Sequence, residues 1–195
     1  MNWKAIAIIV SLLCVACSAR QTGTFTLRSS VVAEGDTLPI EYTGFGAGAT
    51  LPLEWSGAPT ATASYALIMH HVASPTDIHW YWVLYNIPPD VESLPKNVTG
   101  VGKLGNNSVN GRMEFTPPHS KGPGPKTYTL TLYALSQKPA ITVADSLVNR
   151  AVMLDAIKDI TLDSAMLHVV YSRPDSPQAA SSPTSPGRTC RTQYR

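Results

Sequence analysis

The clearest structural signal in this sequence is Thr127-Tyr128-Thr129-Leu130-Thr131-Leu132-Tyr133-Ala134-Leu135, a stretch whose threonines alternate strictly with larger apolar side chains. Successive side chains on a β-strand point to opposite faces, so the alternation predicts a strand with one well-buried face. Two continuous apolar runs of strand length, Tyr65–His70 and Trp80–Tyr85, predict buried strands. Pro88-Pro89 follows the second run closely and is expected to end it.

Shorter segments also predict strands, so the chain as a whole is predicted to be mainly β. We expect further strands at Thr24–Leu27, Leu38–Tyr42 and Met166–Tyr171. One helix is predicted late in the chain, with apolar residues at helical spacing from Leu147 to Ile157 and with Thr142 or Asp145 as its cap. The 16 prolines and 13 glycines among 195 residues favour a loop-rich β architecture over a helical bundle.

The N-terminus is predicted to be an export signal. Residues 1–16 combine one positive charge at Lys4 with an apolar stretch of about a dozen residues, shorter than the roughly 20 that a transmembrane helix needs. The junction Ala16-Cys17 is similar to a bacterial lipobox, with Cys14 in place of the usual leucine. We therefore expect Cys17 to be acylated and to anchor the chain to a membrane, with ordinary signal cleavage as the alternative.

The rest of the chain divides into three parts. Residues 17–23 are expected to be a linker, 24–174 a single domain, and 175–195 a disordered tail rich in Ser, Pro, Thr and Arg. After processing at Cys17, only Cys190 would remain as a thiol, which excludes a disulfide framework or a thiolate zinc site in the domain. A formal charge of +2 gives no indication of a nucleic-acid partner.

Five motifs, in order, resemble the phosphatidylethanolamine-binding protein family, in its bacterial branch of Raf-kinase-inhibitor-like proteins. They cover nearly the whole predicted domain: Leu51-Pro52-Leu53-Glu54-Trp55 with Pro59 and Ser64; Tyr65–Pro75; His79–Pro88; Gly105-Asn106-Asn107 through Gly111; and Phe115-Thr116-Pro117-Pro118 through Gly122 and Tyr128 to Leu135. The resemblance implies an antiparallel Greek-key β sandwich with one or two peripheral helices. It also implies a small pocket for phosphate-like anions or phospholipid head groups.

The pocket wall of the family maps onto this sequence with several replacements. The resemblance places His71 and Ala73 where the family has loop aspartates, and Tyr81 where it has a strand histidine. Lys126 replaces a later histidine and lies two residues before Tyr128. These replacements imply a wall with fewer acids, which would favour anions over zwitterions.

Six residues are therefore candidates for ligand binding. His79 joins them because it lies two residues before Tyr81 on the same face of a strand, and Pro117 because a stiff proline-rich segment can form a pocket rim. The full set is His71, His79, Tyr81, Pro117, Lys126 and Tyr128.

The function most consistent with these residues is that of an exported binding protein for anionic or phospholipid head-group-like ligands, anchored in the bacterial cell envelope. A protein-interaction or inhibitor module acting on an envelope enzyme is the alternative, and a soluble periplasmic or secreted location is the alternative to the anchor. We expect no enzyme and no cofactor, because neither a nucleophile elbow, a P-loop nor a dinucleotide fingerprint is found. A metal site at His70, His71 and His79 is a weaker hypothesis, since adjacent strand residues face opposite sides.

Overall fold

The computed structural model describes residues 23–119, 122 and 124–173. The predicted signal peptide, Cys17, nearly all of the linker and the predicted tail lie outside the described residues. Within the described part, no helix is long and apolar enough to cross a membrane.

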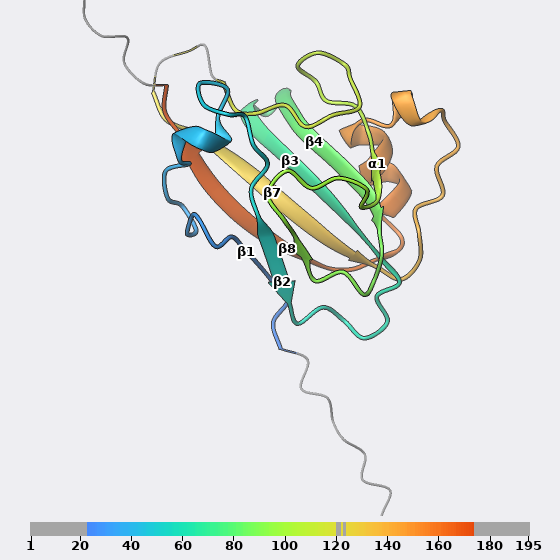
Figure 1. The fold of residues 1–195 in the computed structure, drawn as a ribbon. Helices are drawn as coiled ribbons and strands as arrows, with labels where there is room; N and C mark the ends of the chain where they lie inside the picture. The colour runs from blue at the N-terminus through green and yellow to red at the C-terminus, as the bar shows by residue number, and fades with distance from the viewer. Residues whose placement is uncertain (1–22, 120–121, 123, 174–195) are drawn as a thin grey trace, which may run out of the picture.

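Two antiparallel sheets form the framework (Figure 1). The large sheet has the strand order β6-β4-β3-β7-β8, with bounds Lys103–Leu104, Asp77–Ile87, Ser64–Ser74, Lys126–Leu135 and Thr161–Tyr171. The small sheet has the order β1-β2-β5, with bounds Thr26–Arg28, Leu53–Ser56 and Ser93–Leu94. Strand β7 returns by a long connection to pair with β3, on the side opposite β4, which is the Greek-key arrangement. The predicted Greek-key β sandwich is thus confirmed.

The large sheet has a hydrophobic core on each face. On one face, Leu67 and Leu130 of the large sheet pack in one cluster with Leu27 and Trp55 of the small sheet. On the other face, a smaller cluster includes Ile68 together with Met153 and Ile157 of helix α1 (Arg150–Ile157), which lies to the right of β4 in Figure 1. The alternation along β3 and β7 therefore divides their side chains between the sandwich and the helix.

The helix begins later than the sequence predicted. Asn149 is the cap, and its side chain accepts a hydrogen bond of 2.9 Å from the backbone N–H of Val152. Thr142 and Asp145 were thus wrong as caps. Asp145 instead starts a short 3-10 helix, η2 (Asp145–Leu147), and its carboxylate accepts a 3.0 Å hydrogen bond from the Tyr85 hydroxyl. That contact ties the segment before α1 to the sheet.

The strand predicted at Leu38–Tyr42 is wrong. Residues Ile40–Tyr42 form a 3-10 turn, η1, closed by a 2.9 Å hydrogen bond from Tyr42 N–H to Pro39 O. Pro39 has no N–H to donate to a ladder, so pairing stops at this point. The residues just before it run along the outer edge of β8, where Thr37 bridges Val170 in parallel and Leu38 N–H donates to Val170 O.

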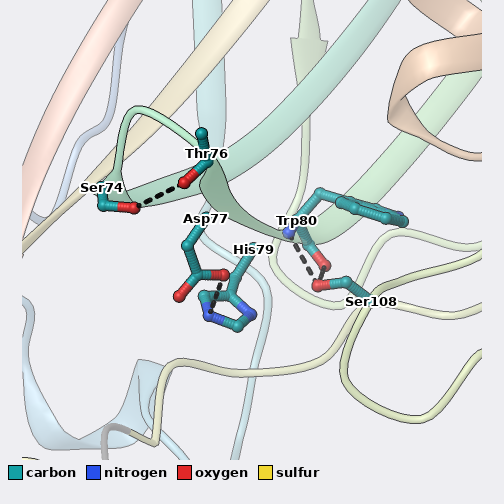
Figure 2. Close-up of polar contacts among 6 residues, drawn as sticks. All are labelled: Ser74, Thr76, Asp77, His79, Trp80 and Ser108. Carbon is teal, nitrogen blue, oxygen red and sulfur yellow. Dashed lines mark hydrogen bonds and ion pairs between the residues drawn. The ribbon is translucent and has the colours of Figure 1, made fainter.

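The β3–β4 hairpin is longer than the apolar runs that predicted it. Both strands continue into polar residues, so that His71 pairs with His79 and Ser74 with Asp77. At the turn, the hydroxyls of Ser74 and Thr76 lie 3.4 Å apart (Figure 2). The hairpin therefore carries several polar side chains beyond the core at one end of the sheet.

A connection after β6 packs back on the outer strand β4. Gly105 N–H donates to Val83 O, and Asn106 N–H donates to Val148 O. Farther along, the buried Asn107 side chain accepts hydrogen bonds from two backbone N–H groups of its own loop. Ser108 Oγ accepts from Trp80 N–H at 2.9 Å and donates to Trp80 O at 3.0 Å, as Figure 2 shows. These bonds fix residues 105–110 beside the hairpin.

We expect Gly105→Ala to destabilise the fold by at least roughly 2 kcal/mol. An added Cβ would lie 2.3 Å from Val148 O and 2.9 Å from a Val83 methyl carbon. That carbonyl is already held by Asn106 N–H and cannot easily withdraw. Urea unfolding would measure the loss. Gly23→Ala, where an added methyl meets nothing within 4 Å, is the control, and equal stabilities would refute the close-packing argument.

His70 lies on the face of β3 that points away from the small sheet. Its buried Nδ1 has no hydrogen-bond partner among the described residues. Burial lowers the pKa of His70 to about 4, and the positive charge of Arg150 contributes in the same direction. His70 is therefore neutral in the folded protein at physiological pH.

His70 should make stability depend on pH between about 4 and 6.5. An unfolded histidine titrates near 6.5, so in this range the unfolded state binds more protons than the folded state. Stability is then fully present above about pH 6.5 and falls by up to roughly 3 kcal/mol as the pH approaches 4. We expect His70→Gln to flatten this dependence in urea unfolding at a series of pH values. An unchanged slope would show that other groups cause it.

Candidate ligand-binding site

A cleft with a volume of about 450 Å³ lies where the polar end of the β3–β4 hairpin meets the start of β7. Five of the six candidate residues line it, namely His71, His79, Tyr81, Lys126 and Tyr128. They come from three neighbouring strands of the large sheet, so the strand register brings them together. Pro117 is not among the lining residues.

Aromatic rings form one wall of the cleft. The fully buried Tyr128 ring packs edge-on against Tyr81, with ring centroids 5.0 Å apart, and stacks on His71 at 5.4 Å. Behind it, Tyr171 of β8 contacts the same ring at 6.4 Å. This packing restricts the rotamers of His71, Tyr81 and Tyr128, so their polar atoms are held in place.

The two cleft tyrosines are neutral hydrogen-bond donors. Burial raises the pKa of Tyr81, and burial together with the adjacent Tyr81 raises that of Tyr128 further. The Tyr128 hydroxyl is buried, and the Tyr81 hydroxyl interacts with it.

Two histidines of the cleft have a fixed ring orientation. His71 Nδ1 lies 2.8 Å from the backbone oxygen of Thr127, and His119 Nδ1 lies 3.0 Å from that of Pro117. A carbonyl oxygen only accepts, so Nδ1 carries the proton in both rings. The Nε2 atom of each ring is then an acceptor when the imidazole is neutral and a donor when it is protonated.

Asp77 and His79 are in polar contact at the cleft, with Asp77 Oδ1 3.2 Å from His79 Nε2 (Figure 2). Their side chains are 59% and 45% exposed, so water screens the pair and its main effect is to orient the imidazole. The expected loss of acids therefore does not hold for the whole wall. Asp77 was missed as a lining residue, although its spacing of two from His79 on one strand places both on the same face.

Lys126, at the start of β7, is the one lysine among the described residues that line the cleft. No ion pair is found for it within that part of the chain. Gly122 lies beside it, and a Cβ on that glycine would approach Lys126 Nζ to 3.3 Å. A larger residue at 122 would thus crowd the ammonium group.

Two loops complete the cleft, and the sequence did not predict their lining residues. Ser108 and Val109 come from the connection fixed on β4, and His119 and Gly122 from the proline-rich segment. Thr116 N–H donates to Tyr81 O at 2.9 Å, which brings this segment to the strand.

Pro117, the sixth candidate, contacts the lining residue His119 but does not itself line the cleft. Its ring is next to Gly48, where an added Cβ would lie 3.2 Å from Pro117 Cγ. Its carbonyl accepts the hydrogen bond from the His119 ring. Within residues 23–119, 122 and 124–173, no group of three or more His, Cys, Asp or Glu side chains is arranged to hold a metal ion.

Comparisons with known proteins agree on one family. The family described as phosphatidylethanolamine-binding protein matches residues 28–172. A UPF0098 protein of Methanothermobacter thermautotrophicus is 30% identical over 151 residues, covering 75% of this chain and 98% of that protein. The UPF0098 protein YbcL of Escherichia coli is 30% identical over 144 residues, covering 66% of this chain and 78% of YbcL.

Solved structures show the same fold. The crystal structure of a phosphatidylethanolamine-binding protein homologue from Chlamydia trachomatis has a TM-score of 0.70 at 23% identity, covering 77% of this chain and 98% of that one. The crystal structure of Escherichia coli YbcL, titled a new member of the mammalian PEBP family, also has a TM-score of 0.70, covering 78% and 100%. Since the family match spans most of the chain and both sheets, the chain belongs to the phosphatidylethanolamine-binding protein family.

Proposed function

We propose that this chain is an exported binding protein of the bacterial cell envelope that holds a small phosphate-bearing or similarly anionic ligand in the cleft. The observation that carries the proposal is the convergence of Lys126 and the buried Tyr128 on one cleft. A phosphate or carboxylate oxygen accepts from both kinds of donor, and a hydrogen bond to a charged group contributes roughly 1.5–3 kcal/mol.

The rest of the lining supports an anion more than a neutral ligand. Tyr81 adds a second neutral donor, and Nε2 of His71 and His119 can each donate when protonated. Asp77 is the opposing charge at the cleft, placed against His79. A ligand that carries an amine in addition to its phosphate could place that amine near Asp77, so both simple anions and zwitterions belong in the test.

Membership of a family named for phosphatidylethanolamine binding makes a binding role the natural expectation for this chain. The orientation of the one serine among the described lining residues argues against hydrolysis by a serine nucleophile. Ser108 donates its hydroxyl proton to Trp80 O and is not directed to His79 or another base. The cleft therefore supports a binding role over nucleophilic catalysis.

We expect Lys126→Met to weaken anion binding by about tenfold to a hundredfold without unfolding the domain. Titration calorimetry with phosphate, phosphoserine and phosphoethanolamine would measure this for the parent and the variant. Lys138→Met is the matched control, because Lys138 is exposed and lies just past the far end of β7. Equal affinity in the parent and Lys126→Met, or no binding of any of these ligands by the parent, would reject the proposed site.

Export and anchoring are tested separately at the other end of the chain. If Cys17 is the acylated N-terminus of the mature protein, bacteria grown with labelled palmitate should label the parent chain but not Cys17→Ala. Intact mass spectrometry would show whether the mature parent chain begins at residue 17. A parent chain without label, or a mature chain that begins elsewhere, would contradict the lipid anchor and leave the proposed cleft untouched.

A further inference from the structure

The cleft contains hydrogen-bond acceptors as well as donors. Nδ1 of His71 and Nδ1 of His119 carry the ring protons, because they lie 2.8 Å and 3.0 Å from backbone carbonyl oxygens, which only accept. In a neutral ring the outer nitrogen, Nε2, then has a lone pair and no proton. Both rings line the cleft. Each of them therefore offers the ligand an acceptor when the imidazole is neutral.

Asp77 adds an acceptor of a different kind to the same lining. Its Oδ1 contacts His79 Nε2 at 3.2 Å, as Figure 2 shows. A carboxylate has several lone pairs, and the Asp77 side chain is 59% exposed, so it stays open to a further donor. An ionised carboxylate also repels a second negative charge. An anion in the cleft therefore gains from Asp77 only if it brings a proton to share.

The donors of the cleft come mainly from β7 and β4. Lys126 has an ammonium group, and Tyr81 has a neutral hydroxyl. Ser108 changes the balance little, because its hydroxyl already donates to Trp80 O and accepts from Trp80 N–H. The lining thus combines donors with acceptors, and it matches a ligand that both accepts and donates hydrogen bonds.

Phosphate and sulfate differ in the property on which this lining depends. Both are tetrahedral oxyanions of nearly the same size. Both are dianions at about pH 8, where a histidine that titrates near 6.5 in water is neutral. Phosphate keeps a proton under these conditions and sulfate does not. Opposite Nε2 of His71 or the Asp77 carboxylate, a P–OH group forms a hydrogen bond, whereas a sulfate oxygen sets lone pair against lone pair.

We propose that the cleft selects an oxyanion that retains a proton, as inorganic phosphate does, over one that is fully deprotonated, as sulfate is. His71, His119 and Asp77 determine this selectivity, while the charge of Lys126 attracts both anions alike. The inference deepens the proposed function and rests on it, because it specifies the ligand of the same cleft. It adds a requirement that attraction of an anion by a cation does not contain.

Titration calorimetry with sodium phosphate and with sodium sulfate, at about pH 8 and equal ionic strength, tests the selectivity. We expect the parent chain to bind phosphate roughly tenfold more tightly than sulfate. Larger ratios belong to sites that exclude water. Here His71 and Asp77 are partly exposed, so water can satisfy an acceptor that the ligand leaves unpaired.

His71→Phe is the main variant. The phenylalanine ring keeps a flat side chain to stack on Tyr128, but it has no nitrogen, so phosphate loses a partner and sulfate loses an opposing lone pair. We expect the ratio of the two affinities to fall by about threefold or more. His168→Phe is the matched control, because His168 lies on the opposite face of the large sheet, in contact with Glu34. It should leave both affinities as they are.

Two further variants test the other acceptors. His119→Phe should reduce the preference for phosphate in the same direction as His71→Phe. Asp77→Asn removes a negative charge and can turn an N–H to the ligand, so sulfate should gain more affinity than phosphate. Thermal unfolding checks that each variant is folded.

The possible results separate the selectivity from the site itself. Equal affinity of the parent chain for phosphate and sulfate would overturn the selectivity and leave the anion cleft in place. A preference for phosphate that persists unchanged in all three cleft variants would show that these residues do not determine it, and the inference would fall. Binding of neither anion would reject the proposed function together with the inference.

Discussion

The simultaneous pairing of β3 with β4 on one side and β7 on the other is the constraint on which both the cores and the cleft depend. It places His71 opposite His79 and aligns His70 with Thr129. Since side chains alternate along a strand, this register sends His71 to the cleft and His70 to the opposite face of the sheet. A slip of one residue would exchange them and turn the apolar side chains of β3 to the wrong faces. The hydrophobic pattern that folds the sheet therefore also assembles the site.

The chemistry of the cleft follows from how its aromatic wall is buried. Close ring packing removes the Tyr128 hydroxyl from water and leaves it to interact with the Tyr81 hydroxyl. Because the raised pKa keeps the phenol protonated, the wall offers a donor that carries no charge. Lys126 supplies the positive charge. The uncharged donor and the charged donor therefore come from two residues, Tyr128 and Lys126, that lie two positions apart on β7.

The local sequence pattern predicted the strands whose alternating side chains bury one face. The alternating stretch Thr127–Leu135 lies within β7. Of the five candidate residues that line the cleft, His79 was predicted from its spacing of two before Tyr81, and the other four came from the family resemblance. Leu38–Tyr42 also alternates, yet it forms a turn because Pro39 cannot donate to a ladder and Leu38 packs against β8.

The rest of the site could not be predicted from local pattern, with one exception. His119 and Val109 reach the cleft only through tertiary hydrogen bonds, such as Thr116 N–H to Tyr81 O. No spacing in the sequence encodes these contacts. Asp77 was the exception, because its position two residues before His79 was visible in the sequence.

The segment from Gly35 to Leu38, which runs along β8, affects whether the outer edge of the large sheet can pair with a strand of another molecule. An outer strand exposes backbone groups that can recruit a strand from another molecule and begin aggregation. Here, Gly35 N–H and Leu38 N–H bind the carbonyls of His168 and Val170, and Asp36 O accepts from Val170 N–H. Nearer the start of β8, the Asp163 carboxylate accepts from Ser164 N–H at 2.7 Å. The outer edge of β8 is thus covered near its C-terminal end, around His168 and Val170, which leaves fewer backbone groups there for pairing with another copy of the chain.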